Sequence, residues 1–205
     1  MHFEVLVEEP SAKTVINALL PPVMGAAHTY EVRVFQGKQD LLKKLPERLK
    51  GYKKWVPPDW KIIVLVDLDR HECHELKNKL EKIAAASTMT TKSVNEHRFQ
   101  VVNRVVIEEL EAWFFGDIKA MRAAYPRLPY NLESKKAYRN PDMITKPSEA
   151  LWRLLQRSGY YKNVSRMPKN KVARDISLYM DPSLNTSQSF RVFRDFFTSY
   201  DQTVA

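Results

Sequence analysis

Acidic side chains follow three apolar segments of the chain, and their types and positions could bind a divalent cation. These acids are Glu8, Glu9, Asp67, Asp69, Glu108, Glu109 and Glu111. Sites built only from oxygen ligands prefer Mg²⁺ or Mn²⁺ to zinc. Carboxylates that converge without a cation repel one another strongly. One or two such ions could activate water and stabilise both oxygens of a phosphodiester displacement, and we therefore expect phosphodiester chemistry here.

The elements that must position these acids are strands that alternate with helices. Short apolar runs predict strands at 3–7, 30–35, 61–66 and 99–107, and helical spacing predicts helices at 12–20, 38–50 and 71–86. The run Lys-Ile-Ile-Val-Leu-Val at 61–66 is apolar on both faces, as a buried parallel strand requires. We expect an α/β fold with a mostly parallel sheet of about four strands flanked by helices. Right-handed crossovers place the carboxyl ends of the strands, and hence the acids, at one edge.

Each acid also has an ordinary explanation. An Asp after a strand often caps the next helix, and a Glu in a first helical turn often interacts favourably with the positive end of the helix dipole. For one acid taken alone this explanation is the better one. The recurrence of acids at the ends of three strands favours a shared site. Strand alternation further predicts that Asp67 and Asp69 point to the same side and face one ion.

The second part of the chain has a different composition. Helical patterns are predicted at 117–124, 147–158, 168–180 and 187–199, and several large aromatic residues lie within them. We expect an α/β core at 1–116 and a basic helical C-terminal region at 117–205 that packs on it, because such apolar groups are too large to leave in water.

The charge of the 205-residue chain is unevenly distributed. The formal net charge is +9, of which residues 1–115 carry +1 and residues 116–205 carry +8. Such asymmetry favours a polyanionic partner, although a merely basic surface explains it equally well. Basic residues expected to contact a nucleic acid are Lys38, Arg70, Arg104, Lys169, Lys171 and Arg174. The alternatives are a solvated lysine at 38 and a local ion pair at 70.

Composition excludes several classes of protein. The five scattered glycines form neither a dinucleotide-binding fingerprint nor an NTP-binding loop. The single cysteine, Cys73, excludes a disulfide framework and a cysteine-based zinc cluster. No apolar run is long enough to span a membrane, and the acidic N-terminal segment is unlike a signal peptide, so we expect a cytoplasmic protein that does not interact with membranes.

A strand that ends in Glu, a later strand that ends in Asp-x-Asp, and a basic companion region resemble the Toprim domain of topoisomerases, primases and overcoming-lysogenization-defect (OLD) nucleases. The whole chain resembles the bacterial Domain of Unknown Function 4276 family, itself Toprim-like. The segments that carry this resemblance are Leu6–Ala12, Phe35–Leu42, Leu65–Arg70 and Val102–Phe114.

The resemblance implies a role for individual residues. Glu8 matches the Toprim glutamate, a metal ligand or general acid/base, while Asp67 and Asp69 match the metal-binding pair. Glu109 and Glu111 resemble a third acidic motif that completes a two-metal site. Lys146 matches a later lysine that stabilises the leaving oxygen in OLD-type enzymes, which makes Glu8, Asp67 and Lys146 the expected catalytic residues.

The chain departs from the family pattern at two positions. Glu9 stands where Toprim domains usually have glycine, and Ala12 stands where OLD-type enzymes often have a further acid. These departures leave open whether one or two ions bind, with Glu9 as the candidate substitute ligand.

The sequence thus supports a hypothesis and an alternative. We expect an enzyme, a Mg²⁺- or Mn²⁺-dependent endonuclease acting on DNA or RNA, and the resemblance implies a bacterial phage-defence role beside a partner ATPase. The alternative, favoured by Ala12, is a non-catalytic subunit that uses the same fold to bind nucleic acid or an ATPase.

Overall fold

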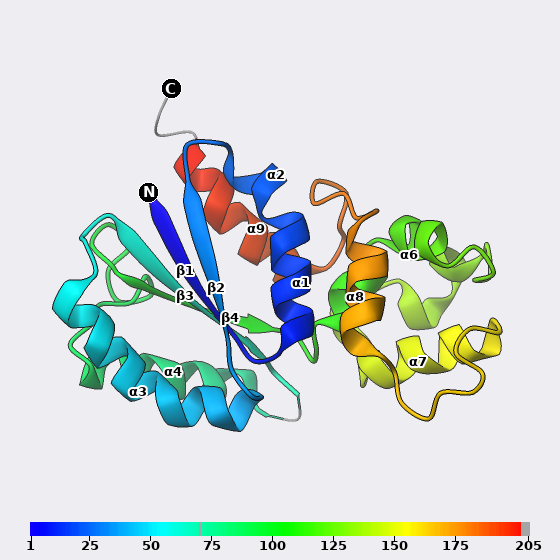
Figure 1. Cartoon of the computed structure of the whole chain (residues 1–205), viewed down its shortest axis with the longest axis horizontal. Coiled ribbons are helices and arrows are strands. Elements are labelled where there is room, and N and C mark those ends of the chain that lie inside the picture. Colours follow the sequence, from blue (N-terminus) through cyan, green and yellow to red (C-terminus); the bar gives the residue numbers. More distant parts are fainter. Residues whose placement is uncertain (70, 202–205) are drawn as a thin grey trace. The chain divides into compact units, whose positions relative to one another are not determined.

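The computed structural model describes residues 1–69 and 71–201, and at 200 and 201 it describes the backbone alone. The chain divides into two compact units (Figure 1). Unit 1 comprises residues 1–13 and 26–105, and unit 2 comprises residues 14–25 and the chain from 106 onward. The division expected at 116/117 therefore falls inside unit 2, which also includes a segment from the N-terminal part of the sequence.

Unit 1 is built on a four-stranded parallel sheet, as the sequence predicts. Its strands are β1 (His2–Val7), β2 (Thr29–Val34), β3 (Trp60–Asp67) and β4 (Val101–Val106), and their order is β2-β1-β3-β4. Val7 is the β1 partner of both Val34 in β2 and Leu65 in β3. The three strands therefore end at nearly the same level, which places the residues that follow them along one edge of the sheet.

The sheet owes its stability to strands that are apolar on both faces. Every residue of β3 from Ile62 to Val66 is buried, and Phe3 to Val7 of β1 are buried too. Such continuous burial is typical of parallel strands covered on both sides. Each of the apolar side chains among them, all except Glu4, contributes roughly 1.5–3 kcal/mol when fully removed from water.

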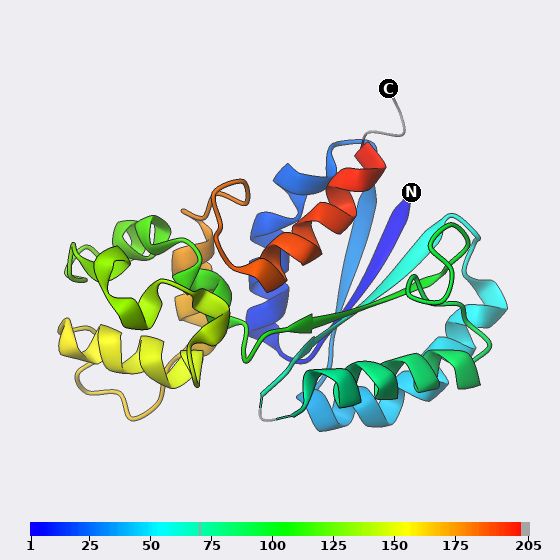
Figure 2. The same cartoon turned by 180° about the vertical axis from the view of Figure 1, so that it is seen from behind.

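Helices α3 (Lys38–Trp55) and α4 (Cys73–Ala86) lie next to each other across one face of this sheet (Figures 1 and 2). The buried stripe of α3 has the spacing of an amphipathic helix, with Leu41, Leu45, Leu49 and Tyr52 facing the interior. Because Tyr52 continues that stripe, α3 extends beyond the predicted end at residue 50.

The expected alternation from Asp67 to Asp69 is wrong. Strand β3 ends at Asp67, and Asp69 lies in a turn with a φ of +53°. A left-handed residue reverses the local direction of the chain, so the two-residue period of a strand no longer relates the two side chains.

Unit 2 is helical. Its elements are most of α1 (Pro10–Leu19), α2 (Pro21–Met24), α5 (Glu111–Phe115), α6 (Ile118–Ala124), the 3₁₀ turns η1 (Leu132–Ser134), η2 (Lys136–Tyr138) and η3 (Pro141–Met143), α7 (Pro147–Arg157), α8 (Lys169–Ser177) and α9 (Gln188–Asp201). The core is aromatic: Trp113 of α5 packs against Phe190 and Phe193 of α9, and its indole N–H donates to the Ser189 hydroxyl at 3.0 Å. This bond satisfies the one polar atom of the buried indole.

Among the residues that the structure describes, none of the helices combines the length and apolar character that crossing a membrane requires.

Candidate functional site

The sheet of unit 1 has a reversal of strand order between β1 and β3. The chain leaves β1 for β2 on one side and later enters β3 on the other side, as the order β2-β1-β3-β4 shows. In open α/β sheets, ligands bind outside the carboxyl ends of the strands at such a reversal. At this reversal, Glu8 immediately follows β1, and Asp67 is the last residue of β3.

Glu8 is held against the end of β3. Its Oε1 accepts the backbone N–H of Asp67 at 2.8 Å. Burial raises the pKa of Glu8 to about 7, and the charges of Asp69 and Glu9 add to the increase. The hydrogen bond from Asp67 and the charge of Lys38 oppose it only in part. A carboxyl group that titrates near neutral pH in a ligand-binding crevice is a candidate acid or base.

Lys38 ties the turn after β3 to the first turn of α3. Its Nζ donates to Asp67 O at 2.5 Å, to Leu68 O at 3.0 Å and to Asp69 Oδ2 at 3.1 Å. The side chain is only 10% exposed. An ammonium has three N–H donors, and these three acceptors use all of them.

Gly37 brings Lys38 to this position. Its φ of +92° is one that side-chain-bearing residues rarely adopt, and its N–H donates to Glu8 O at 2.8 Å. The expected contact of Lys38 with a nucleic-acid phosphate stays a prediction. The sequence analysis did not predict that Lys38 bonds to the turn at residues 67–69. The only local indication is a glycine followed by a lysine at the start of a helix, and this pattern is weak.

Oxygen atoms dominate the edge formed by Glu8, Asp67 and Asp69, and a positive charge, the Lys38 ammonium, already lies among them. This donor chemistry fits a hard cation. Mg²⁺ is commonly held by one or two carboxylates together with waters and substrate phosphates. Within residues 1–69 and 71–201, no three His, Cys, Asp or Glu side chains form a group that could hold a metal ion. Arg70, which the sequence suggests as a phosphate contact, lies outside the described residues.

Glu109 and Glu111 belong to unit 2, where each contacts a residue of that unit. Glu109 Oε2 accepts the backbone N–H of Ser148 at 2.7 Å, in the first turn of α7. Its negative charge therefore lies at the positive end of a helix dipole. The side chain of Glu111 is almost fully buried, with Oε1 3.8 Å from Lys169 Nζ. A metal-binding role for either acid stays a prediction.

Lys146 precedes α7 in a left-handed conformation with a φ of +50°. Its Nζ donates to Glu149 Oε1 at 2.7 Å, three residues further on. Because Arg153 donates to the other oxygen of the same carboxylate, Glu149 is shared by two cations. The proposed part of Lys146 in leaving-group stabilisation is not tested by this arrangement.

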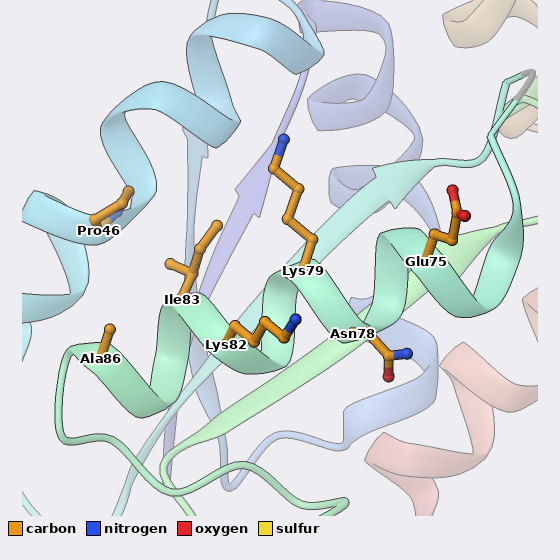
Figure 3. A pocket seen from close by; sticks show the side chains of 7 residues that line it. All are labelled: Pro46, Glu75, Asn78, Lys79, Lys82, Ile83 and Ala86. Carbon is orange, nitrogen blue, oxygen red and sulfur yellow. The ribbon is translucent and has the colours of Figure 1, made fainter.

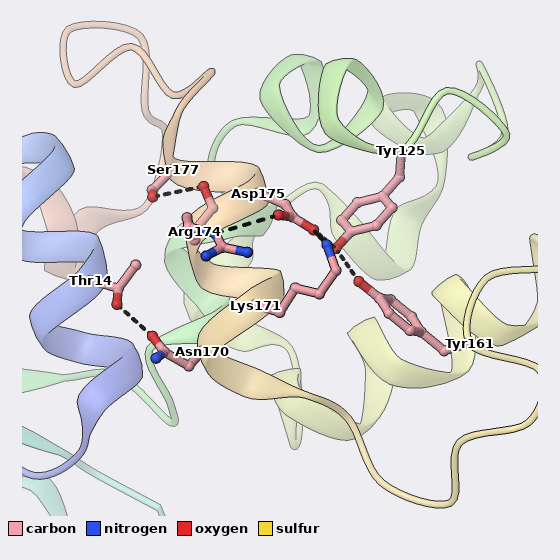
Figure 4. A network of polar contacts seen from close by, with 8 residues as sticks. All are labelled: Thr14, Tyr125, Tyr161, Asn170, Lys171, Arg174, Asp175 and Ser177. Carbon is pink, nitrogen blue, oxygen red and sulfur yellow. Dashed lines mark hydrogen bonds and ion pairs between the residues drawn. The ribbon is translucent and has the colours of Figure 1, made fainter.

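The remaining basic residues are divided between the units. Arg104 lies on β4, and burial lowers the pKa of its guanidinium. Lys171 and Arg174 project from α8 toward Asp175, with Lys171 Nζ at 2.6 Å and Arg174 Nε at 3.9 Å from its oxygens. Figure 4 shows that this carboxylate also lies beside the hydroxyl of Tyr125, which donates to it at 3.1 Å.

A cavity of about 500 Å³ between α3 and α4 contains none of the predicted site residues (Figure 3). Its lining residues are Pro46, Glu75, Asn78, Lys79, Lys82, Ile83 and Ala86. Figure 3 shows charged and amide side chains extending from α4 without converging on one point. The acidic edge at Glu8 and Asp67 is therefore a better candidate for a functional site than this cavity.

Comparison with known proteins places the chain in one family. No curated protein and no solved structure matches it significantly. A family model described as a domain of unknown function, DUF4276, matches residues 7–199. Since this match covers Glu8, Asp67, Asp69 and nearly the whole sequence, the chain belongs to the DUF4276 family.

Proposed function

We propose that the protein is a Mg²⁺- or Mn²⁺-dependent nuclease that cleaves phosphodiester bonds in DNA or RNA. The observation that carries the proposal is the bond between Glu8 and the backbone of Asp67, which brings an acid of raised pKa to the strand reversal. The likeness to Toprim domains, which use a Glu and an Asp-x-Asp pair, supports it. A defence role beside a partner ATPase is the expectation that accompanies this proposal.

The residues at this edge have different roles in the proposed reaction. Asp67 and Asp69 would provide oxygen ligands for a divalent ion, and that ion would supply positive charge for the phosphate and increased acidity for water. Glu8 suits proton transfer because its pKa of about 7 lets it accept and release a proton at neutral pH. Lys38 holds the Asp67–Asp69 turn in place through its three bonds.

The test is a cleavage assay on single-stranded DNA, duplex DNA and RNA, tRNA included, with Mg²⁺ or Mn²⁺. Asp67→Asn and Glu8→Gln should each reduce cleavage by at least about a hundredfold, since each removes a group used in the reaction. The matched control is Asp59→Asn, because this exposed acid adjoins the opposite end of β3. Cleavage that survives both site substitutions would refute the proposal.

One observation favours the alternative, a subunit that binds nucleic acid or an ATPase without cleaving. The Lys38 ammonium already pairs with the Asp69 carboxylate, as a resident counter-ion would. Thermal unfolding with and without Mn²⁺ separates the two proposals, because an ion that binds only the folded protein raises the midpoint. A midpoint that Mn²⁺ does not move, together with nucleic-acid binding and no cleavage, would establish the alternative.

A further inference from the structure

Unit 2 contains a cavity of about 600 Å³ whose charged lining residues are all basic. They are Arg127, Lys135, Arg153 and Arg157, and no Asp or Glu of the described chain is among the residues that line it. A cavity of this volume is within the range of small-ligand sites. It shares no residue with the acidic edge of unit 1, since every lining residue belongs to unit 2.

Two of these cations come from one face of α7. Arg153 and Arg157 are four residues apart, so their side chains lie one turn above the other and repel. Arg153 donates to Glu149 Oε2 at 2.9 Å, but that carboxylate is also bound by Lys146. Among the described residues, the side chains of Arg157 and Lys135 make no hydrogen bond or ion pair. The positive charge on this side of α7 is therefore only partly compensated.

Arg127 is fixed in orientation. Its guanidinium lies 4.0 Å from the centre of the Tyr160 ring and donates to Gly159 O at 3.1 Å. Gly159 has a φ of +81°, and an added Cβ would lie 3.3 Å from the Arg127 guanidinium. The backbone at Gly159 and the ring of Tyr160, which follow α7, thus hold the Arg127 guanidinium in one orientation. A guanidinium fixed in this way loses little conformational entropy when it binds an anion.

The cavity wall also includes an aromatic ring. Tyr138 of η2 lies nearly parallel to Phe115, with ring centres 5.1 Å apart and an interplanar angle of 15°. Proteins that bind single strands combine a basic groove with aromatic rings on which bases stack. A rigid duplex is too wide to enter such a cavity, whereas one or two nucleotides of a single strand can.

We propose that this cavity binds the backbone of single-stranded nucleic acid, with Arg153, Arg157 and Lys135 contacting phosphates. The choice of nucleic acid as the phosphate-bearing ligand rests on the proposed nuclease function. The cavity contains none of the cleaving acids, so binding can be measured without cleavage.

The experiment is fluorescence anisotropy of a labelled single strand of about 12 nucleotides, as DNA and as RNA, with chelator present. Arg153→Gln/Arg157→Gln should weaken binding about tenfold or more at about 50 mM salt, and should reduce the salt dependence. The control is Lys162→Gln/Arg166→Gln, which removes the same charge from exposed positions of unit 2 outside the cavity. Unchanged binding in the cavity variant, or equal loss in the control, would overturn the proposal.

Further measurements identify the ligand and provide a variant for the case in which the double variant does not fold. Mononucleotide and inorganic phosphate are added as competitors, and binding of either in place of the single strand would overturn the nucleic-acid assignment. Arg157→Gln alone should weaken binding several-fold, and it serves if the double variant does not fold. If wild type binds through the cavity but never cleaves, the nuclease function fails while this inference stands.

Discussion

Glu8 and Asp67 are 59 positions apart in sequence, yet the Glu8 carboxylate accepts the Asp67 backbone N–H at 2.8 Å. The bond joins the residue after β1 to the last residue of β3, where the strand order reverses. It keeps one Glu8 oxygen fixed, while burial makes the negative charge costly and raises the pKa of the carboxyl group. The same group therefore combines fixed geometry with a proton affinity suited to neutral pH.

A first prediction concerns the pH dependence of stability in chelator. Folding raises the pKa of Glu8 from 4.5 to about 7, so the folded protein holds this proton where the unfolded chain loses it. The free energy of unfolding should consequently decrease as the pH rises from about 4.5 to about 7. Glu8→Gln removes this effect and should stabilise the protein by up to roughly 3 kcal/mol at about pH 8, with no gain below about pH 4.

Urea unfolding across this pH range makes the measurement. Glu96→Gln, an exposed acid of unit 1, is the charge-matched control and should leave the pH profile unchanged. An identical profile for wild type and Glu8→Gln would contradict the assignment of a raised pKa to Glu8.

A second prediction concerns Lys38→Met. This change leaves the backbone oxygens of Asp67 and Leu68 without the ammonium donor and Asp69 without its ion pair. The free energy of unfolding should fall by roughly 1–3 kcal/mol, because the lysine is largely buried. In the same helix, Lys44 forms an exposed ion pair with Asp40, so Lys44→Met should cost less than about 1 kcal/mol. Equal losses in chemical denaturation would show that Lys38 is no more than a surface lysine.

The sequence allowed the sheet to be predicted because its signal is local. The short apolar run at 61–66 is rich in β-branched residues, which favours a buried strand, and the acids that follow such runs mark the strand ends. The parallel arrangement then predicted that Glu8 and Asp67 share an edge, and unit 1 confirms this proximity.

Features that depend on tertiary contacts could not be predicted in this way. Asp69 adopts a left-handed turn beside the Lys38 ammonium, an arrangement that no pattern near Asp69 indicates. Residues 14–25 belong to unit 2 although they lie between two strands of unit 1. The basic cavity also escaped sequence analysis, because Arg127 and Arg157 are 30 positions apart in different elements.

A third prediction concerns a buried carboxylate that takes no part in the proposed chemistry. Glu4 is 1% exposed and receives hydrogen bonds from Arg33 Nε at 3.1 Å and from the Tyr52 hydroxyl at 2.9 Å. Burial by itself raises the pKa of Glu4, but these two hydrogen bonds together with the charges of Arg33 and His2 outweigh it, and the net pKa is lowered. The stability that Glu4 contributes is therefore present above pH 4.5 and is lost as the pH falls further.

Arg33→Met should destabilise the protein by roughly 1–3 kcal/mol at neutral pH, because the buried Glu4 charge loses its main partner and water reaches the half-exposed Arg33 position. Glu4→Leu/Arg33→Met should recover only part of this loss, since it removes the buried charge but leaves the Tyr52 hydroxyl without its acceptor. Thermal unfolding of the three proteins tests both statements. A double variant that is less stable than Arg33→Met would show that the carboxylate is stabilising in its own right.

A fourth prediction separates two roles of Glu109, whose Oε2 accepts the Ser148 N–H at the start of α7. Glutamine keeps an oxygen acceptor but loses the charge, so Glu109→Gln should cost at most about 1 kcal/mol of stability. If Glu109 is a metal ligand, as the family resemblance implies, the same change should reduce the Mn²⁺-induced rise in the unfolding midpoint, because a neutral amide is a weaker ligand for a hard cation. Glu133→Gln, an exposed acid of unit 2, should leave that rise intact. A full Mn²⁺ response in Glu109→Gln would identify Glu109 as a helix cap alone, since the capping bond survives the change while the ligand charge does not.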